Sequence, residues 1–207
     1  MVAPKTNAYS LIEAKPFSPH LGAEVYGVDL SETISDAQFA EILDAFLKYQ
    51  VLFFKNQKEI PPEQHVIFGK RFGPLHAHPA APTMEGHPEI FEIHATKDSK
   101  VANGEFWHSD VSCDDTPPLG TMLQIHIAPP YGGDTMFSNM EAAYEDLSDP
   151  MKKMLGGLRA LHSSEHIYKG RYSDRGKRDV DIDCPEAVHP IVRTHPDTGR
   201  KSLFVNR

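Results

Sequence analysis

Hydrophobic and polar positions in the first third of the chain follow strand and helix periods in turn. Residues 22–30 (GAEVYGVDL) alternate loosely between turn-forming residues, which predicts a strand. Residues 35–47 begin with a Ser-x-x-Gln capping box and then repeat apolar residues at helical spacing, so we expect a helix there. The apolar run 51–54 (VLFF) is typical of a buried strand, and residues 61–72, which begin with proline and precede a glycine, predict a second helix.

The remainder of the chain combines a loop-rich segment with shorter regular elements. Residues 75–115 are rich in His, Pro, Gly and Asp, and long irregular segments in compact domains are often functional. Strands are expected at residues 90–94, 121–127, 189–195 and 201–205, and short helices at residues 139–147 and 148–158. This balance predicts a mainly β fold with flanking helices, a jelly roll (double-stranded β-helix), in a single domain over residues 1–207.

Composition and charge exclude some classes of protein. A formal net charge of −8 argues against a nucleic-acid-binding surface, because such a surface needs clustered Lys and Arg. No apolar run approaches the roughly 20 residues of a membrane span, and the N-terminus lacks the apolar stretch of a secretion signal. A cytoplasmic protein is therefore expected, with Cys113 and Cys184 as reduced thiols. The 12 histidines are more informative, because histidine often serves as a metal ligand.

His108 and Asp110 form the motif that most directly suggests chemistry. Two residues apart on an extended segment, their side chains project to the same face and can reach one ion. An imidazole and a carboxylate, completed by a second imidazole, leave three positions on Fe(II) open for a bidentate 2-oxo acid and dioxygen. The tripeptide alone is weak evidence, and by itself it favours a structural hydrogen bond between the two side chains near a loop.

The surrounding segments carry a resemblance to a known family. The stretch WHSDVSCDDTPPLGTMLQIHIAPPYGGDT resembles the taurine dioxygenase / 2,4-dichlorophenoxyacetate dioxygenase family, in which W-H-x-D is followed by a P-P turn, a strand and a G-G-D-T turn. The segments LGAEVYGVDL, YQVLFF, FGPLHAHP and HPIVRTHPDTGRKSLFVN also look like family segments, in the family's order. Together these motifs cover most of the chain and are far more specific than one tripeptide.

The resemblance implies an Fe(II)- and 2-oxoglutarate-dependent dioxygenase. Such an enzyme would use O2 to hydroxylate a small acidic substrate, a sulfonate, a sulfate ester or an aryloxy or other carboxylate, and would yield succinate and CO2. His108 and Asp110 would be iron ligands, and Thr135 would help to hold 2-oxoglutarate through its hydroxyl group. Thr135 also has a structural interpretation, as a β-branched residue that favours extended structure.

Three further residues are implied on the substrate side. His78 matches the position whose imidazole contacts the acidic group of the substrate, Val111 would line the pocket with its main chain, and Asn103 could reach the substrate. A loop histidine bonded to backbone and a core valine are the structural alternatives. Taurine-using relatives carry a tyrosine where this chain has Ala81. The smaller side chain predicts an enlarged pocket, so a substrate bulkier than taurine is as plausible as taurine itself.

The resemblance also implies residues that the chain does not contain. The family's distal histidine ligand and its carboxylate-binding arginines lie beyond the segment that ends this chain, so a third iron ligand is expected beyond Arg207. His189 and His195 are the local histidines that could replace it, but in the resemblance they belong to a hairpin. We expect the chain to be the N-terminal part of a longer protein, or a product truncated before its last core strands.

Two alternatives from other classes stay open. A truncated jelly-roll relative could serve as a non-catalytic binding or structural protein. A hydrolytic zinc enzyme could use His108, Asp110 and another histidine, although the chain lacks the H-E-x-x-H motif of many such enzymes. An incomplete sheet has open edges that invite pairing, so a homo-oligomer is expected.

Overall fold

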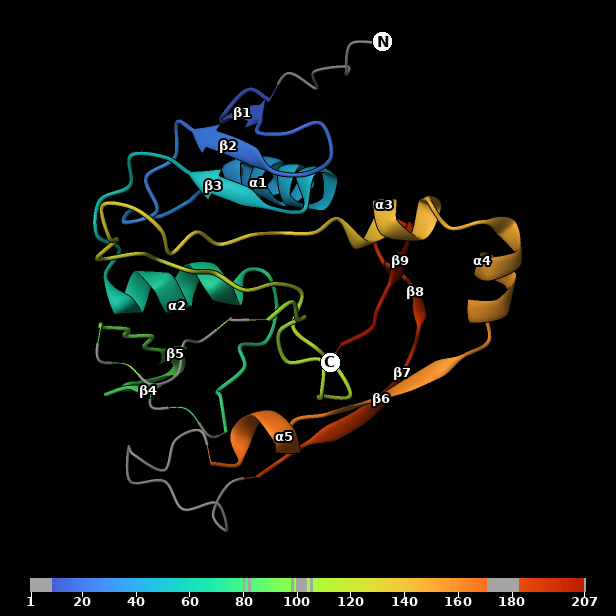
Figure 1. Cartoon of the computed structure of the whole chain (residues 1–207). Helices are drawn as coiled ribbons and strands as arrows, with labels where there is room; N and C mark the ends of the chain where they lie inside the picture. The colour runs from blue at the N-terminus through green and yellow to red at the C-terminus, as the bar shows by residue number, and fades with distance from the viewer. Residues whose placement is uncertain are drawn as a thin grey trace. The chain divides into compact units, whose positions relative to one another are not determined.

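The structure is a computed structural model that describes residues 9–79, 81, 83–97, 99, 104, 106–170 and 183–206. The chain divides into two compact units, which Figure 1 colours by residue number. The N-terminal unit comprises Met1–Phe72 and Leu123–Asn139, and the C-terminal unit comprises Gly73–Met122 and Met140–Arg207. Within the described residues there are nine strands and five helices, in the mainly β balance that the sequence predicts.

A three-stranded sheet and one helix form the core of the N-terminal unit. Strand β1 (Glu13–Pro16) runs antiparallel to β2 (Ala23–Tyr26), and β2 runs parallel to β3 (Leu52–Phe54). Helix α1 (Asp36–Tyr49) connects the two parallel strands and lies against the sheet in Figure 1. The strands expected within residues 22–30 and 51–54 are therefore confirmed, while β1 was not predicted.

The ends of the first two helices lie close to the predicted positions. Ser35 is the N-cap of α1, and its side chain accepts a hydrogen bond from the Gln38 backbone N–H at 3.2 Å, as in a capping box. The Gln38 side chain does not return to Ser35; it donates instead to the carbonyl oxygens of Leu11 and Gly27. Helix α2 (Pro62–Lys70) begins after proline, as predicted.

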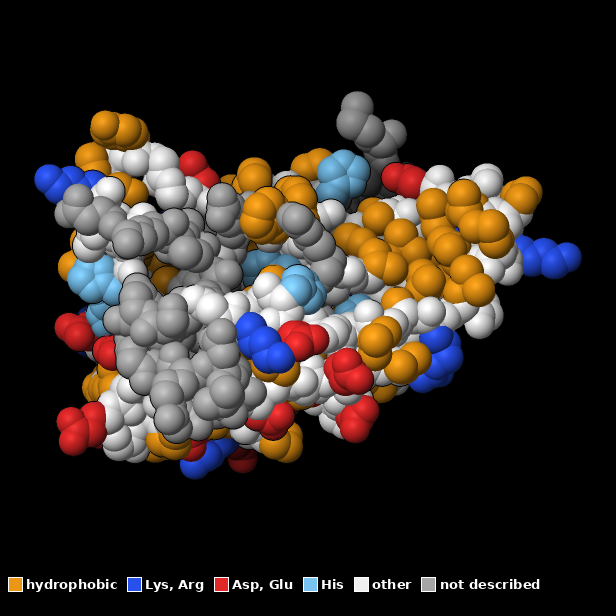
Figure 2. Space-filling view, turned by 60° about the horizontal axis from the view of Figure 1, so that its bottom comes forward, with side chains coloured by type: hydrophobic (Ala, Val, Ile, Leu, Met, Phe, Trp, Pro, Cys, Tyr) orange, Lys and Arg blue, Asp and Glu red, His pale blue; other side chains and the backbone are white. Residues whose placement is uncertain are grey.

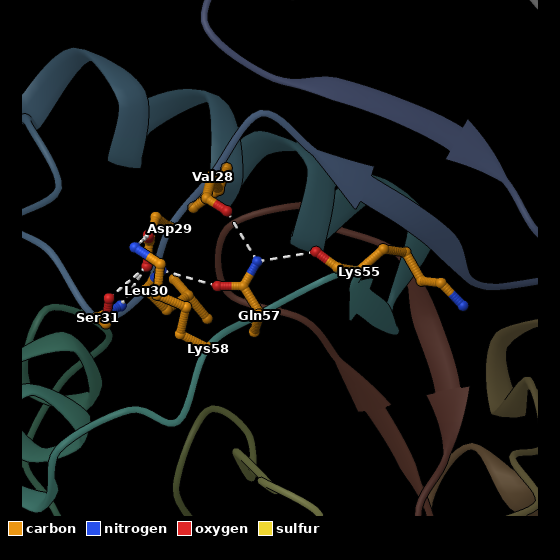
Figure 3. Close-up of polar contacts among 7 residues, drawn as sticks. All are labelled: Val28, Asp29, Leu30, Ser31, Lys55, Gln57 and Lys58. Atoms are coloured by element: carbon orange, nitrogen blue, oxygen red, sulfur yellow. Dashed lines mark hydrogen bonds and ion pairs between the residues drawn. The ribbon is translucent and has the colours of Figure 1, made fainter.

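Gln57 ties the segment after β2 to the segment after β3 (Figure 3). Its side-chain oxygen accepts a hydrogen bond from the Leu30 N–H at 2.8 Å, and its side-chain nitrogen donates to the carbonyl oxygens of Val28 and Lys55 at 2.7 and 3.0 Å. One side chain thus satisfies three backbone groups that no sheet partner reaches.

Three two-stranded sheets and three short helices make up the C-terminal unit. The sheets pair β4 with β5, β6 with β7 and β8 with β9, all antiparallel. The strands are β4 (Thr83–Met84), β5 (His87–Phe91), β6 (Arg159–Ser163), β7 (Glu186–Pro190), β8 (Val192–Thr194) and β9 (Lys201–Leu203), and the helices are α3 (Met140–Glu145), α4 (Asp149–Leu155) and α5 (Glu165–Tyr168). The helices expected at residues 139–147 and 148–158 and the hairpin expected near the end of the chain are confirmed.

The strand predicted at residues 121–127 is wrong. These residues have no assigned secondary structure, and the apolar members of the alternating pattern are exposed: Leu123 at 59%, Ile125 at 65% and Ile127 at 90%. Among the described residues no strand pairs with this segment, and an extended segment without a hydrogen-bonding neighbour is not a strand. Strand β5 also lies a few residues earlier than the predicted 90–94.

Several hydrophobic side chains lie at the surface. In the antiparallel β6–β7 strand pair Leu161 lies opposite Val188, and these two side chains are 60% and 48% exposed. On the other face of this strand pair His162 and His189 are buried. Figure 2 shows hydrophobic side chains gathered on part of the surface that it displays. None of the described helices is both long enough and apolar enough to cross a membrane.

Candidate metal centre

His108 and Asp110 lie next to each other on an irregular segment of the C-terminal unit. The Nε2 atom of His108 is 3.2 Å from the Oδ1 atom of Asp110, and the two side chains are 46% and 52% exposed. The segment around them is neither helix nor strand. The two side chains therefore face each other, as both the predicted metal pair and the structural hydrogen bond between them would require, and the role of the pair as metal ligands stays a prediction.

The hydrogen bond of His108 defines which nitrogen can bind a metal. Its Nδ1 atom is 2.7 Å from the carbonyl oxygen of Phe106, and a carbonyl oxygen can only accept, so Nδ1 carries a proton. In the neutral ring Nε2 then has the free lone pair, and Nε2 is the atom that lies 3.2 Å from Oδ1 of Asp110. Metal-binding histidines are commonly held in this way, with the other ring nitrogen donating to a carbonyl group.

Asp110 is held by a matching contact on its far side. The hydroxyl group of Thr121 donates to Oδ2 at 2.8 Å, which leaves Oδ1 facing His108. Two electron-rich atoms therefore lie 3.2 Å apart, an arrangement that needs either a proton or a cation between them. An imidazole nitrogen and a carboxylate oxygen that lie together in this way are donor atoms that would suit Fe(II).

A third protein ligand does not join the pair within the part of the chain that the structure describes. No group of three or more His, Cys, Asp or Glu side chains there could hold a metal ion. Nε2 of His189 donates to the Asp114 carbonyl oxygen at 2.9 Å, and Nδ1 of His195 accepts from the backbone of its own hairpin. The expectation of a third ligand beyond Arg207 stays a prediction.

Val111 has an unusual backbone conformation immediately after the pair. Its φ angle is 52°, in the left-handed region that a β-branched residue rarely adopts. Such strain persists where the surrounding structure holds it, and it is often found at functional sites. Ser112 and Cys113, which follow, are buried at 4% and 7% exposure. The predicted main-chain role of Val111 toward a substrate is compatible with this geometry and stays a prediction.

His78 lies in an aromatic environment in the same unit. Its Nδ1 atom accepts a hydrogen bond from the Ala81 N–H at 2.9 Å, the backbone contact that the structural interpretation predicts. In the neutral ring Nε2 therefore carries the proton and is a donor, which is the polarity that an acidic group requires. The ring lies 4.8 Å from that of Tyr168 and 5.4 Å from that of Phe91.

Tyr168 also occupies the space next to Ala81. Ala81 is only 5% exposed and forms a buried cluster with Tyr168, against which Phe91 and Cys184 pack. The expected enlargement of a pocket at Ala81 is thus not seen among the described residues, because the ring of Tyr168 fills this region. Sequence reasoning missed this tyrosine because it lies 87 positions further along the chain, in an unpredicted helix.

The remaining predicted residues are not brought to the pair by any described contact. Thr135 belongs to the N-terminal unit, where it is exposed and follows Gly132 and Gly133, both with φ of 74°. Asn103 lies outside the described residues. Their predicted roles toward 2-oxoglutarate and the substrate stay predictions.

Comparisons with known proteins place the chain in a family. Residues 13–207 match the family described as "Taurine catabolism dioxygenase TauD, TfdA family". The chain therefore belongs to this family of 2-oxoglutarate-dependent non-haem iron dioxygenases, and the resemblance found in the sequence is confirmed.

Individual relatives agree with this family. The chain is 34% identical to an alkylsulfatase of Acinetobacter baylyi, over 96% of this chain and 64% of that protein. It is 30% identical to the α-ketoglutarate-dependent 2,4-dichlorophenoxyacetate dioxygenase of Cupriavidus pinatubonensis, over 94% of this chain and 73% of that protein.

A crystal structure of a taurine dioxygenase from Burkholderia xenovorans matches with a TM-score of 0.71 and 34% identity, over 95% of this chain and 64% of the other. The jelly-roll class predicted from the sequence is thereby confirmed. The chain spans about two thirds of the length of these relatives.

Proposed function

We propose that His108 and Asp110 are two protein ligands of the iron of a 2-oxoglutarate-dependent dioxygenase. The observation that supports this most strongly is the pair itself, an imidazole lone pair and a carboxylate oxygen that face each other at 3.2 Å. Each ligand is also fixed from behind, His108 by the Phe106 carbonyl group and Asp110 by the Thr121 hydroxyl group. This combination of ligands and supporting contacts is typical of a metal site.

The proposed substrates are small acids: sulfonates, sulfate esters and aryloxy or other carboxylates. One relative is named an α-ketoglutarate-dependent sulfate ester dioxygenase and another a (S)-phenoxypropionate/α-ketoglutarate dioxygenase. By the family resemblance, the imidazole of His78, whose Nδ1 accepts from the Ala81 N–H, would bind and orient the acidic group of the substrate. Thr135 would contribute its hydroxyl group to 2-oxoglutarate, as the family resemblance implies.

The proposed reaction converts 2-oxoglutarate, O2 and the substrate R–H into succinate, CO2 and R–OH. Bound iron supplies the chemistry that couples the decarboxylation of 2-oxoglutarate to the oxidation of the C–H bond. The contribution of the chain is to hold the two ligands in one geometry and to orient the acidic group of the substrate, so that the target carbon lies at the reactive centre. Neither of these roles requires a general base.

Succinate formation tests this proposal. The product of the complete reading frame that encodes this chain would be reconstituted anaerobically with Fe(II) and assayed with alkyl sulfates, alkanesulfonates and aryloxy acids. We expect His108→Ala and Asp110→Ala to lower the rate by at least about 1,000-fold. His94→Ala, on an exposed loop of the same unit, should leave the rate unchanged.

Two outcomes would contradict the proposal. Full succinate production by His108→Ala would show that this imidazole is not a ligand. The absence of Fe(II)-dependent 2-oxoglutarate turnover with every substrate class would favour the non-catalytic alternative, in which the fold serves as a binding or structural protein.

A further inference from the structure

Asn206 contacts the segment that carries the metal pair from 97 positions further along the chain. Its side-chain nitrogen donates to the carbonyl oxygen of Ser109 at 3.1 Å and to the hydroxyl oxygen of Ser112 at 2.7 Å. Its side-chain oxygen accepts a longer hydrogen bond from the Ser109 N–H at 3.4 Å. One amide group therefore makes three contacts with two residues, Ser109 and Ser112, which are three positions apart.

The contacts with Ser109 act on the backbone that joins the two proposed metal ligands. Ser109 stands between His108 and Asp110, so its N–H belongs to the peptide group that joins it to His108. Its carbonyl group belongs to the peptide group that joins it to Asp110. Because Asn206 bonds to both, it restricts the orientation of each peptide plane that links the two proposed ligands.

Other described contacts on the backbone of this segment come later in it, from the Asp114 N–H to the Val111 carbonyl oxygen and from His189 to the Asp114 carbonyl oxygen. The segment is neither helix nor strand, so no ladder of hydrogen bonds fixes it, and Val111 holds a strained φ of 52°. A primary amide suits the task, since it offers two donors and an acceptor in one plane. An aspartate of the same size keeps only acceptors and would face the Ser109 carbonyl oxygen without a proton to share.

Asn206 is itself anchored to the sheets of the C-terminal unit. Two residues earlier, the Phe204 N–H donates to the Ile191 carbonyl oxygen at 2.7 Å. The Phe204 ring stacks on His162 at 5.0 Å and meets His189 edge-on at 5.3 Å. These contacts fix the backbone that carries Asn206. Its amide group therefore holds the segment around Ser109 and Ser112 in place relative to the strands of the C-terminal unit.

We propose that Asn206 is a positioning residue for the iron pair. It acts through Ser109 and Ser112 and is not proposed as a metal ligand. The inference rests on the proposed function, because it assigns Asn206 to the same site, but the hold on the segment exists in the metal-free protein and can be measured there.

The test compares Asn206→Ala and Asn206→Asp with the wild type in two measurements. Hydrogen exchange of residues 106–115 in metal-free protein should be about tenfold faster in both variants, because Asn206→Ala loses all three contacts and Asn206→Asp loses the two that the amide nitrogen donates. Anaerobic equilibrium dialysis should show Fe(II) affinity lowered by about 10- to 100-fold, the usual effect of removing a supporting contact. Asn139→Ala, which removes a side-chain bond to His20 in the other unit, is the matched control and should change neither.

The two proposals fail in different ways. Wild-type protein that binds no Fe(II) would overturn the proposed function. If the wild type binds Fe(II), and both Asn206 variants keep its affinity and its exchange rates, the positioning role of Asn206 is wrong and the metal site stands.

Discussion

Two histidines of the C-terminal unit are held in opposite tautomers. The Nδ1 atom of His108 donates to the Phe106 carbonyl oxygen, which leaves a lone pair on Nε2. The Nδ1 atom of His78 accepts from the Ala81 N–H, which leaves a proton on Nε2. A ring nitrogen with a lone pair can bind a metal ion, and a ring N–H can donate a hydrogen bond to an acidic group. Each backbone contact therefore selects the tautomer that the proposed role requires.

Thr121 gives a test of the support behind Asp110. Thr121→Val keeps the shape of the side chain and removes the hydroxyl group that donates to Oδ2. We expect Fe(II) affinity, measured by anaerobic equilibrium dialysis, to fall by about 10- to 100-fold. Thr116→Val, an exposed position on the same irregular segment, is the control. Equal affinities for the wild type and Thr121→Val would rule out this supporting role.

His162 is predicted to make stability depend on pH. It is 4% exposed, and neither ring nitrogen has a hydrogen-bond partner among the described residues. Burial, followed by the charge of the neighbouring His189, lowers the pKa of His162 below its usual value of 6.5. The unfolded chain therefore binds the proton more readily, so stability is greatest above about pH 6.5 and falls as the pH drops through that value.

The measurement is urea unfolding between pH 5 and 8. His162→Phe keeps a ring against Phe204 and removes the titrating group, so the free energy of unfolding should vary less with pH than in the wild type. His94→Phe on an exposed loop is the control. An identical pH dependence in the wild type and His162→Phe would show that this imidazole does not titrate between the folded and unfolded states.

At the scale of elements, the sequence predicted the helix starts and turns that depend on residues close to one another in the chain. The start of α1 follows from the Ser35 cap and the apolar repeat behind it, and the Gly199 turn follows from its own residues. The segment 121–127 has an alternating pattern but lacks a described strand to pair with, and pairing is not encoded in the segment itself. Helix α5 has only four residues, too few to show a period.

Gln57 is expected to stabilise the N-terminal unit through its three backbone contacts. Gln57→Ala leaves the Leu30 N–H and the Val28 and Lys55 carbonyl oxygens without this partner, and should lower the free energy of unfolding by about 1–3 kcal/mol. Gln64→Ala in α2 is the matched control and should cost less than about 0.5 kcal/mol. Urea unfolding that gives the same loss for both variants would contradict the role of Gln57.

At the scale of the whole molecule, the exposed face of the β6–β7 strand pair should promote self-association. Leu161 and Val188 lie opposite each other and are both largely exposed, and neighbouring apolar side chains at a surface favour contact with a second one. We expect the double variant Leu161→Lys, Val188→Thr to lower the mass-average size seen by light scattering at high concentration. A size unchanged from the wild type would place the expected homo-oligomer contact elsewhere.

The candidate site could be predicted only in part because it is assembled across the chain. His108 and Asp110 lie in one short motif, from which the sequence predicts them as ligands. Thr121 and Asn206 lie 11 and 97 positions from the residues they hold, and no periodicity or spacing reports such contacts. The aromatic ring beside Ala81 was missed for the same reason.

The most direct test of the central claim is Fe(II) binding to the Asp110→Asn variant. This change keeps the size of the side chain and an oxygen for Thr121, and removes the negative charge beside His108. Anaerobic equilibrium dialysis of the complete gene product should show one Fe(II) per wild-type chain, and an affinity at least about 100-fold lower in Asp110→Asn. Equal Fe(II) affinity in the two proteins would contradict the assignment of Asp110 as an iron ligand.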